Sequence, residues 1–339
     1  MNKFFLSVLF SFIILLSNSI SLAADVSSDL VKYNGLVQHI FFHSLIIYPE
    51  KAEADVKNAQ GFKDNMITVK QFKEILQELY DDNFILIDSR TLYSFDENGN
   101  IKQNDLYLPK DKKPLIISLD DLNYYHYMRN GGFANKLVLD NGVIKTQVIT
   151  PEGEKIITDD GDVVPILDKF VAEHPDFSLN GAKGIIAVTG FQGILGYRTQ
   201  AKSINSVTER VAVLPVVDAL KKTGWAFANH SYTHNQVFLH NTITMAELAD
   251  DITKWKAEVE PLVGPTNIFI GPFGQIFKEG QKRRQQLYDA GFKVLYGVGM
   301  DGYFQFSKDH FAMNRINIDG FRLAHNPKTL FRIFGILVK

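Results

Sequence analysis

The sequence predicts a parallel (β/α) barrel, an α/β fold in which strands and helices alternate along one chain. Short apolar runs of strand type recur through the sequence, and helical patterns lie between them. Several runs are continuously apolar, which is typical of strands that are covered on both faces of a parallel sheet. The alternation repeats seven or eight times, which favours one barrel over two separate domains.

The predicted strands are short and rich in Ile, Leu, Val and Phe. They are expected at Leu36–Phe42, Phe84–Ile87, Leu115–Leu119, Gly184–Val188, Trp225–Ala228, Asn267–Ile270, Lys293–Tyr296 and Met313–Ile318.

Two predicted helices have an explicit start signal. The pairs Thr68…Gln71 and Thr244…Glu247 fit a capping box, and apolar residues at i, i+3, i+4 and i+7 follow each of them. Weaker helical patterns cover Pro165–Glu173, Val213–Lys222 and Gly280–Ala290, and Gly291 is placed to end the last of these.

Residues 126–163 interrupt the alternation and predict a β-ribbon inserted after the third strand. Lys136–Asp140 and Val143–Ile149 flank Asn141-Gly142, which is a strong two-residue hairpin signal. We expect the ribbon to lie over the mouth of the barrel, because it directly follows the strand that ends at Leu119. The stretch from Asp159 to Asp162 lacks the later ligands of a calcium loop and predicts a solvated turn.

Residues 1–24 are expected to form a signal peptide, which leaves 25–339 as a single barrel domain. Phe4–Leu16 is apolar but short for a membrane span, and small residues follow it, so we expect cleavage near Ala24 or Asp25. The alternative is a retained N-terminal anchor. The sequence therefore predicts a secreted protein, extracellular or periplasmic, whose contact with a membrane is limited to its export signal.

Composition narrows the choice of partners and ligands. The sequence has no cysteine, which excludes disulfides and thiolate metal ligands. Without Lys3 the chain has 35 basic residues (36 − 1) and 38 acidic ones, a formal charge of −3. This balance argues against nucleic acid as a partner, since phosphate binding needs a basic surplus. Nothing in the sequence fixes the oligomeric state.

Two polar motifs each follow an apolar strand. Asp120-Asp121 follows Leu115–Leu119, and His230-Ser-Tyr-Thr-His234 follows the strand that starts at Trp225. The C-terminal ends of the strands form the active face of a parallel barrel, so both motifs should open at one mouth. Side chains alternate along a strand, so the two aspartates should have different tasks.

These residue types suit a catalytic metal site. His230 and His234 lie on one face if a helical turn starts there. Two imidazoles and one carboxylate form a three-ligand site with an open position for water. A divalent ion acidifies that water and polarises a carbonyl, and the other carboxylate takes the proton. The motifs therefore indicate hydrolysis of an amide or an ester.

Leu119-Asp120-Asp121 and His230–His234 resemble the first two motifs of the polysaccharide deacetylases, carbohydrate esterase family 4, also called the NodB homology domain. Weaker matches bring the resemblance to residues 36–320. It implies a distorted (β/α)7 barrel that removes N-acetyl groups from an N-acetylglucosamine polymer. It also implies that Asp120 is the catalytic base and that Asp121, His230 and His234 bind zinc, with cobalt or nickel as alternatives.

The sequence departs from that family in its later motifs. The third motif reads Ile270-Gly-Pro-Phe-Gly274, so the arginine that orients the base is replaced by Ile270. Arg198 and Arg315 are candidates for its role, and nothing in the sequence selects one. By analogy the backbone N–H of Phe273 stabilises an oxyanion. His325 is the best match to the family's general acid.

Several alternatives remain open at this stage. His43 ends the first strand and either faces the site or is a hydrogen-bonded barrel histidine. Tyr124 and Tyr125 are candidates for stacking on sugar rings or for packing. His310 is a weaker candidate acid than His325. A barrel that binds glycan without activity and a deacylase for non-sugar substrates are the rival functions.

Overall fold

Seven parallel strands close into a ring in the computed structural model, which describes residues 30–300 and 303–326. Each strand pairs with the next in the ring, and the last pairs with the first. In ring order they are β2 (Gln38–Phe42), β7 (Lys113–Leu119), β11 (Gly184–Val188), β12 (Trp225–Asn229), β13 (Ile268–Ile270), β14 (Val294–Val298) and β16 (Phe311–Asn317). The predicted (β/α)7-type barrel is confirmed.

The ring is distorted where β11 meets β7. Strand β11 pairs with β7 only at Ser118 and Leu119, near the C-terminal end of β7. The N-terminal part of β7, Lys113 to Leu115, pairs instead with β3 (Phe84–Leu86). The predicted strand at Phe84–Ile87 therefore exists but lies outside the ring, so the eight predicted strands give a seven-stranded barrel.

Alternation along each strand separates the inside of the ring from its helix-covered outside. On β7 the side chains of Ile116, Ser118 and Asp120 share one face, and Ile117 and Leu119 lie on the other. Ile117 and Leu119 pack in the large cluster that includes the helices, whereas Ile116 belongs to the interior cluster. A strand that is buried on both faces reads as a continuous apolar run, as predicted.

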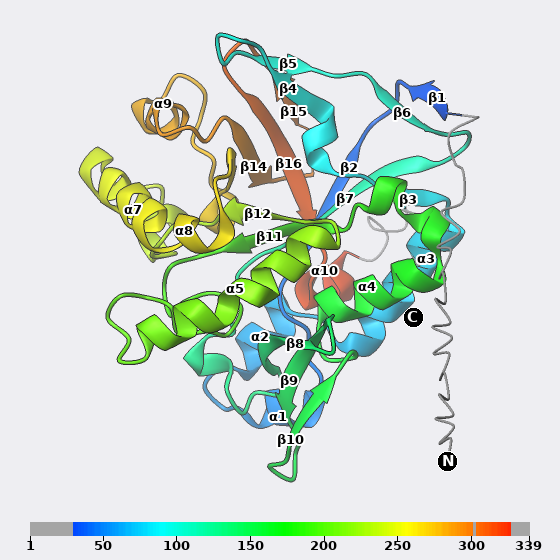
Figure 1. Cartoon of the computed structure of the whole chain (residues 1–339), viewed down its shortest axis with the longest axis vertical. Coiled ribbons are helices and arrows are strands. Elements are labelled where there is room, and N and C mark those ends of the chain that lie inside the picture. Colours follow the sequence, from blue (N-terminus) through cyan, green and yellow to red (C-terminus); the bar gives the residue numbers. More distant parts are fainter. Residues whose placement is uncertain (1–29, 301–302, 327–339) are drawn as a thin grey trace, which may run out of the picture.

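Helices surround the ring (Figure 1). They are α1 (Pro49–Ala54), α2 (Ala59–Asn65), α3 (Val69–Asp81), α4 (Val163–Glu173), α5 (Ser206–Lys222), α6 (Gln236–Leu239), α7 (Met245–Glu258), α8 (Glu260–Val263), α9 (Lys282–Asp289) and α10 (Gly320–His325). The described residues also contain 3₁₀ turns in the connections between strands and helices, at Ser89–Leu92, His126–Met128, Pro175–Phe177, Leu179–Gly181 and Pro272–Gly274.

The helix starts follow the sequence signals to different degrees. Both predicted capping boxes are present, at the starts of α3 and α7. Helix α5 begins at Ser206, earlier than predicted, and it continues through Pro215. Helix α4 begins at Val163 because Asp162 caps its N-terminus. Asp162 is fully buried, so the predicted solvated turn is wrong at that residue.

The inserted ribbon is a three-stranded antiparallel sheet of β8 (Ala134–Asp140), β9 (Val143–Ile149) and β10 (Lys155–Thr158). Asn141 and Gly142 both have positive φ, as the predicted two-residue hairpin turn requires. The ribbon packs on α4 and α5 instead of covering the mouth. The expected placement is therefore wrong, because the apolar face of the ribbon is buried against these two helices.

Smaller strand pairs decorate the ring. Strand β1 (Leu30–Tyr33) pairs with β6 (Leu106–Pro109), β4 (Tyr93–Phe95) pairs with β5 (Ile101–Gln103), and β15 (Phe304–Phe306) lies antiparallel to β16. Among the described residues, no helix has the length and apolar character needed to cross a membrane. The predicted signal peptide, residues 1–24, lies outside the described part of the chain.

Candidate metal centre and active site

The motif residues gather at the C-terminal ends of the ring strands, around a cavity of about 580 Å³. This is the end at which parallel barrels carry their active sites. Contributions come from β2, β7, β12 and β13: the cavity is lined by His43, Asp120, Asp121, His230, His234 and Phe273, among others. The structure therefore brings together every predicted site residue except His325.

Asp121, His230 and His234 form a three-ligand set. One ligand atom from each of them lies within 4.8 Å of the other two. Within this set, His234 Nε2 lies 3.5 Å from Asp121 Oδ2. Ligand atoms around a tetrahedral zinc ion lie about 3.4 Å apart, given metal–ligand distances of about 2.1 Å. Two imidazoles and a carboxylate in this arrangement fit a divalent metal ion.

The ring of His230 is oriented for this task. Its Nδ1 lies 2.7 Å from the Ile270 carbonyl oxygen, which can only accept a hydrogen bond. Nδ1 therefore carries the proton, and Nε2 is left as the metal ligand. Burial lowers the pKa of His230, and the nearby Asp120 and Asp121 only partly offset it. The neutral form that a metal needs is thereby favoured.

The loop from His230 to His234 is not the helical turn that the four-residue spacing suggests. Ser231 and His234 have φ of 66° and 45°, and helix α6 begins only at Gln236. The two imidazole rings still meet, with centroids 4.9 Å apart. The predicted meeting of the two histidines is right, but a strained loop brings it about.

Asp251 of α7 holds this loop in shape. The side chain is buried, and its carboxylate accepts hydrogen bonds from the backbone N–H groups of Tyr232 and Thr233 and from the hydroxyls of Ser231 and Thr233. Asp251 was not among the predicted site residues. In the sequence it is visible as an aspartate on the apolar side of a helix that starts with a capping box, and a charge that is buried there needs partners.

Asp120 forms a two-pronged ion pair with Arg315. The two guanidinium nitrogens of Arg315 lie 2.7 and 2.9 Å from the two carboxylate oxygens. Burial alone would raise the pKa of Asp120, but the charges of Arg315 and His230 outweigh it and hold that pKa below its usual range. Asp120 is therefore ionised, and its partner is Arg315 of β16.

The second candidate, Arg198, has another role. Its guanidinium donates to the backbone carbonyls of Gln192, at 2.7 Å, and of Tyr124. Arg198 therefore ties together the loops that follow β7 and β11. Of the two arginines, the structure selects Arg315 as the partner of the base.

Asp121 has a different environment, as the alternation argument predicted. Its backbone is left-handed, with φ of 58°, and Tyr125 donates a hydrogen bond of 2.5 Å to its Oδ1. Burial raises the pKa of Asp121, but the charges of His234 and His230 reverse the shift, so that the net pKa is lowered. Tyr125 is buried and supports a ligand, whereas Tyr124 is buried away from the cavity lining. Tyr125 is nevertheless part of the cavity lining, whereas Tyr124 is not.

Phe273 and His43 flank this centre. Phe273 is left-handed, with φ of 53°, and its ring lies 4.5 Å from that of His234. His43 Nδ1 lies 3.1 Å from the Asn65 carbonyl oxygen, which leaves Nε2 unengaged by that bond. The charge of His43 also lowers the pKa of Asp120 and of Asp121. Its contribution is smaller than those of burial and of the other charged residues. His43 thus faces the site, which settles one of the alternatives.

The structure does not bring His325 to the site. It is exposed on α10, its Nδ1 bonds to the Phe321 carbonyl, and its ring stacks on that of Phe321. His310 is also elsewhere, bonded to Ser307 and stacked on Tyr288. The prediction of His325 as general acid is corrected, because the sequence could not tell that α10 turns this side chain outward.

Exposed aromatic side chains surround the mouth of the cavity. Tyr127, Phe191 and Phe273 are each 41–51 % exposed although they line the cavity. Together they give the mouth of the cavity a partly exposed aromatic lining. The three aromatic residues come from three different loops, so no local sequence motif predicts that they lie together.

No family model matches the sequence, and no curated protein matches it significantly. Three solved structures are similar in fold at low sequence identity. One is IcaB from Ammonifex degensii, with 9 % identity and a TM-score of 0.46 over 86 % of this chain and 95 % of that one. Another is a de-N-acetylase from Aggregatibacter actinomycetemcomitans, with 15 % identity and a TM-score of 0.47 over 84 % and 96 %.

The third is the BpsB deacetylase domain from Bordetella bronchiseptica, with 11 % identity and a TM-score of 0.32 over 62 % of this chain and 73 % of that one. The chain is a distorted (β/α)7 barrel with a candidate metal centre at its mouth.

Proposed function

We propose that this protein is a metal-dependent hydrolase that removes N-acetyl groups from an N-acetylglucosamine-containing polysaccharide. One observation carries the proposal. A three-ligand set of Asp121, His230 and His234 lies beside an ionised Asp120 that is not one of the ligands, and both face one open cavity. This separates the group that takes a proton from the groups that bind a metal, as hydrolysis of an amide requires.

The residues divide the reaction between them. Asp120, fixed by Arg315, accepts the proton of the attacking water. A divalent ion, zinc with cobalt or nickel as alternatives, supplies Lewis-acid polarisation of the acetyl carbonyl and acidifies water when it is bound. The N–H of Phe273 stabilises the negative charge that develops on the carbonyl oxygen. His43 lines the cavity and its Nε2 is not engaged by the bond to Asn65, so it is the side chain that gives a proton to the departing amine.

The surroundings of the cavity favour a carbohydrate polymer as the substrate. The ring centroids of Tyr127 and Phe191 lie 5.9 and 6.0 Å from that of Tyr125, so the three aromatic side chains are neighbours in the lining of the cavity. Exposed aromatic rings combine an apolar face with polar neighbours, which suits a sugar ring better than a fully apolar acyl chain. The cavity is open, so a chain can pass across it.

We further propose that the protein acts outside the membrane, after export through the signal in residues 1–24. The support is the sequence pattern alone: a short apolar segment followed by small residues. N-terminal sequencing of the extracellular or periplasmic protein tests this proposal, and an intact Met1 on a membrane-bound product would contradict cleavage.

Acetate release tests the proposed reaction. The substrates are chitin oligomers, peptidoglycan and poly-N-acetylglucosamine, each with and without added zinc or cobalt. We expect release from at least one of them that a chelator abolishes and metal restores. Glycan binding without release would favour a non-catalytic barrel, and release from small esters alone would favour a non-sugar deacylase.

Two histidine variants test the assignment of the acid. We expect His43→Ala to lower kcat by about 10²–10⁴-fold, because the amine leaves without its proton. His325→Ala is the matched control and should keep wild-type kcat, since His325 is exposed on α10. The reverse result would restore the sequence-based assignment.

A further inference from the structure

Buried polar side chains continue below Asp120 inside the barrel. Arg315 Nη1 donates to Asp120 at 2.7 Å and also to the hydroxyl oxygen of Ser118 at 3.0 Å. His39 Nε2 lies 3.0 Å from the same hydroxyl oxygen. These four side chains are each at most 4 % exposed. They form one chain of contacts, from Asp120 through Arg315 and Ser118 to His39.

The chemistry of the groups fixes the direction of each hydrogen bond. A guanidinium can only donate, so the Ser118 oxygen accepts from Arg315. The hydroxyl hydrogen of Ser118 then needs an acceptor, and His39 Nε2 is within reach. If Nε2 donated instead, Ser118 would face two donors and its own hydrogen would lack an acceptor among the contacts described here. We infer that His39 accepts at Nε2 and carries its proton on Nδ1, which is buried and has no hydrogen-bond partner among the described residues.

The electrostatics agree with this arrangement. Burial and the charge of Arg315 lower the pKa of His39 well below its usual range, so the imidazole is neutral and one of its two ring nitrogens can accept a hydrogen bond. Arg315 donates to Ser118, and Ser118 donates onward to His39. Hydrogen bonds that follow one another in the same sense polarise and strengthen each other in a buried site.

We propose that His39 is a positioning residue: through Ser118 it fixes the guanidinium of Arg315 and thereby the carboxylate of Asp120. This role rests on the proposed deacetylase function. It adds to that function a residue that lies inside the barrel, away from the mouth. His39 touches no part of the metal centre. Its effect on catalysis passes entirely through the orientation of the base.

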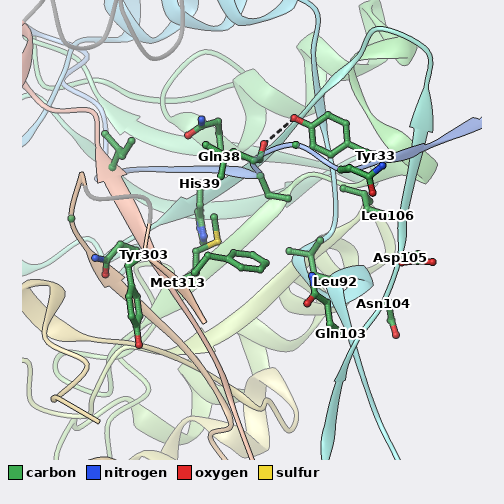
Figure 2. A pocket seen from close by; sticks show the side chains of 18 of the residues that line it. Tyr33, Gln38, His39, Leu92, Gln103, Asn104, Asp105, Leu106, Tyr303 and Met313 are labelled. Carbon is green, nitrogen blue, oxygen red and sulfur yellow. Dashed lines mark hydrogen bonds between the residues drawn. The ribbon is translucent and has the colours of Figure 1, made fainter. Parts of the chain in front are cut away.

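A second cavity gives room to test this residue. His39 lines a cavity of about 520 Å³ that is separate from the metal site, together with residues of β1, β6 and β16 (Figure 2). In Figure 2 its side chain is drawn with Met313 and Tyr303 among the lining residues. Substitutions at His39 therefore have space to adjust on one side without displacing the strands.

Three variants of similar size separate hydrogen bonding from packing. His39→Gln can place an amide oxygen near the position of Nε2, where it accepts from Ser118. His39→Asn carries the same amide on a shorter stem that does not reach, and His39→Leu has no acceptor. Loss of one buried hydrogen bond should lower kcat about fivefold to tenfold in the Asn and Leu variants. His39→Gln should recover most of that loss.

Ser118→Ala completes the test. It should lower kcat as His39→Leu does, and the double variant should be no worse than either single one, because both break one chain of contacts. KM and metal content should stay at wild-type values in all of these variants. Additive losses, wild-type kcat in His39→Leu, or equal losses in the Gln, Asn and Leu variants would overturn the proposal.

An NMR measurement decides the matter without activity. The ¹⁵N shifts of the His39 ring, assigned by their loss in His39→Gln, should show a protonated Nδ1 and an unprotonated Nε2. A protonated Nε2 would overturn the proposed contacts even in a protein that releases acetate. Failure of the wild-type protein to release acetate from any substrate would instead count against the proposed function.

Discussion

The two ends of the barrel interior differ in chemistry. At the N-terminal end the ring is filled mainly by buried apolar side chains, such as Ile116, Ile185 and Ile268. At the C-terminal end equally buried positions hold Asp120 and His230, with Arg315 beside them. Burial of apolar groups stabilises the fold, whereas burial of charges costs free energy unless they are paired. The N-terminal end of the barrel interior therefore stabilises the strands, and the C-terminal end holds the candidate site.

Several residues around the candidate metal ligands have a left-handed backbone. Asp121, His234 and Phe273 line the cavity, Ser231 lies in the loop between the two histidines, and all four have positive φ. Each such residue costs about 1–3 kcal/mol and persists only where the surrounding structure enforces it. For the loop from His230 to His234 the buried carboxylate of Asp251 supplies that enforcement. The C-terminal end of the barrel therefore combines paired buried charges with backbone strain, whereas the N-terminal end is mainly apolar packing.

The largest expected effect separates the two aspartates at the mouth. Asp120→Asn should keep the metal but lower the rate of acetate release by about 10²–10⁴-fold, because the proton acceptor is lost. Asp121→Asn should instead weaken metal binding, since a neutral amide is a poorer ligand than a carboxylate. Elemental analysis paired with acetate release measures both effects.

His230→Ala and His234→Ala are the companion variants for that experiment. They should behave like Asp121→Asn and be partly rescued by excess metal. Full metal occupancy in Asp121→Asn together with metal loss in Asp120→Asn would reverse the two assignments. Unchanged occupancy and activity in all four variants would contradict the metal site.

The next effect tests the cost of a charge at the mouth. Arg315→Met should lower the free energy of unfolding by about 3–5 kcal/mol, because it leaves Asp120 buried and unpaired. Adding Asp120→Asn to the same chain should restore most of that stability but no activity. Urea unfolding of the two variants measures this. If the double variant were as unstable as Arg315→Met, the loss would come from packing on Phe41 and not from the charge.

A smaller effect is expected in the apolar layer. Ile268→Ala should lower the free energy of unfolding by about 2–5 kcal/mol, since a fully buried side chain is shortened. Its kcat and metal content, measured on the folded fraction, should match the wild type. A loss of kcat comparable to that of the mouth variants would mean that the two ends are not separable.

The smallest effect concerns pH and a further buried carboxylate, Asp162. Burial raises its pKa to about 6, and its Oδ1 accepts from the N–H groups of Leu45 and Val163. A raised pKa means that the folded state holds the proton more tightly. The contribution of this group is therefore favourable at pH 4 and is lost as the pH rises to 6, by at most about 3 kcal/mol.

Asp162→Asn isolates this effect, because an amide keeps both hydrogen bonds and cannot ionise. Its stability relative to the wild type should rise between pH 4 and pH 7, as measured by urea unfolding at each pH. A difference that is independent of pH would show that Asp162 ionises in the folded state as freely as in the unfolded chain.

Sequence patterns predicted the ring well because each strand is a local apolar run with a sharp end. They also found Asp120, Asp121, His230 and His234, since each motif directly follows such a strand. They could not choose Arg315, because its partner lies 195 residues away and only ring closure joins them. They misplaced His325 and missed Asp251 for the same reason: the orientation of a helix on the barrel is a tertiary property.

Ring closure also sets an order of events during folding. Strand β16, near the C-terminal end of the barrel, pairs with β2 near its start, through Ile316 opposite Ile40 and Asn317 opposite Phe41. Contacts of such long sequence separation form late, because the loop entropy between them must first be overcome. Arg315 belongs to the same strand. A chain whose synthesis has not reached β16 therefore contains Asp120 without the guanidinium that pairs with it. The ion pair at the mouth of the barrel thus depends on the same strand that closes the ring.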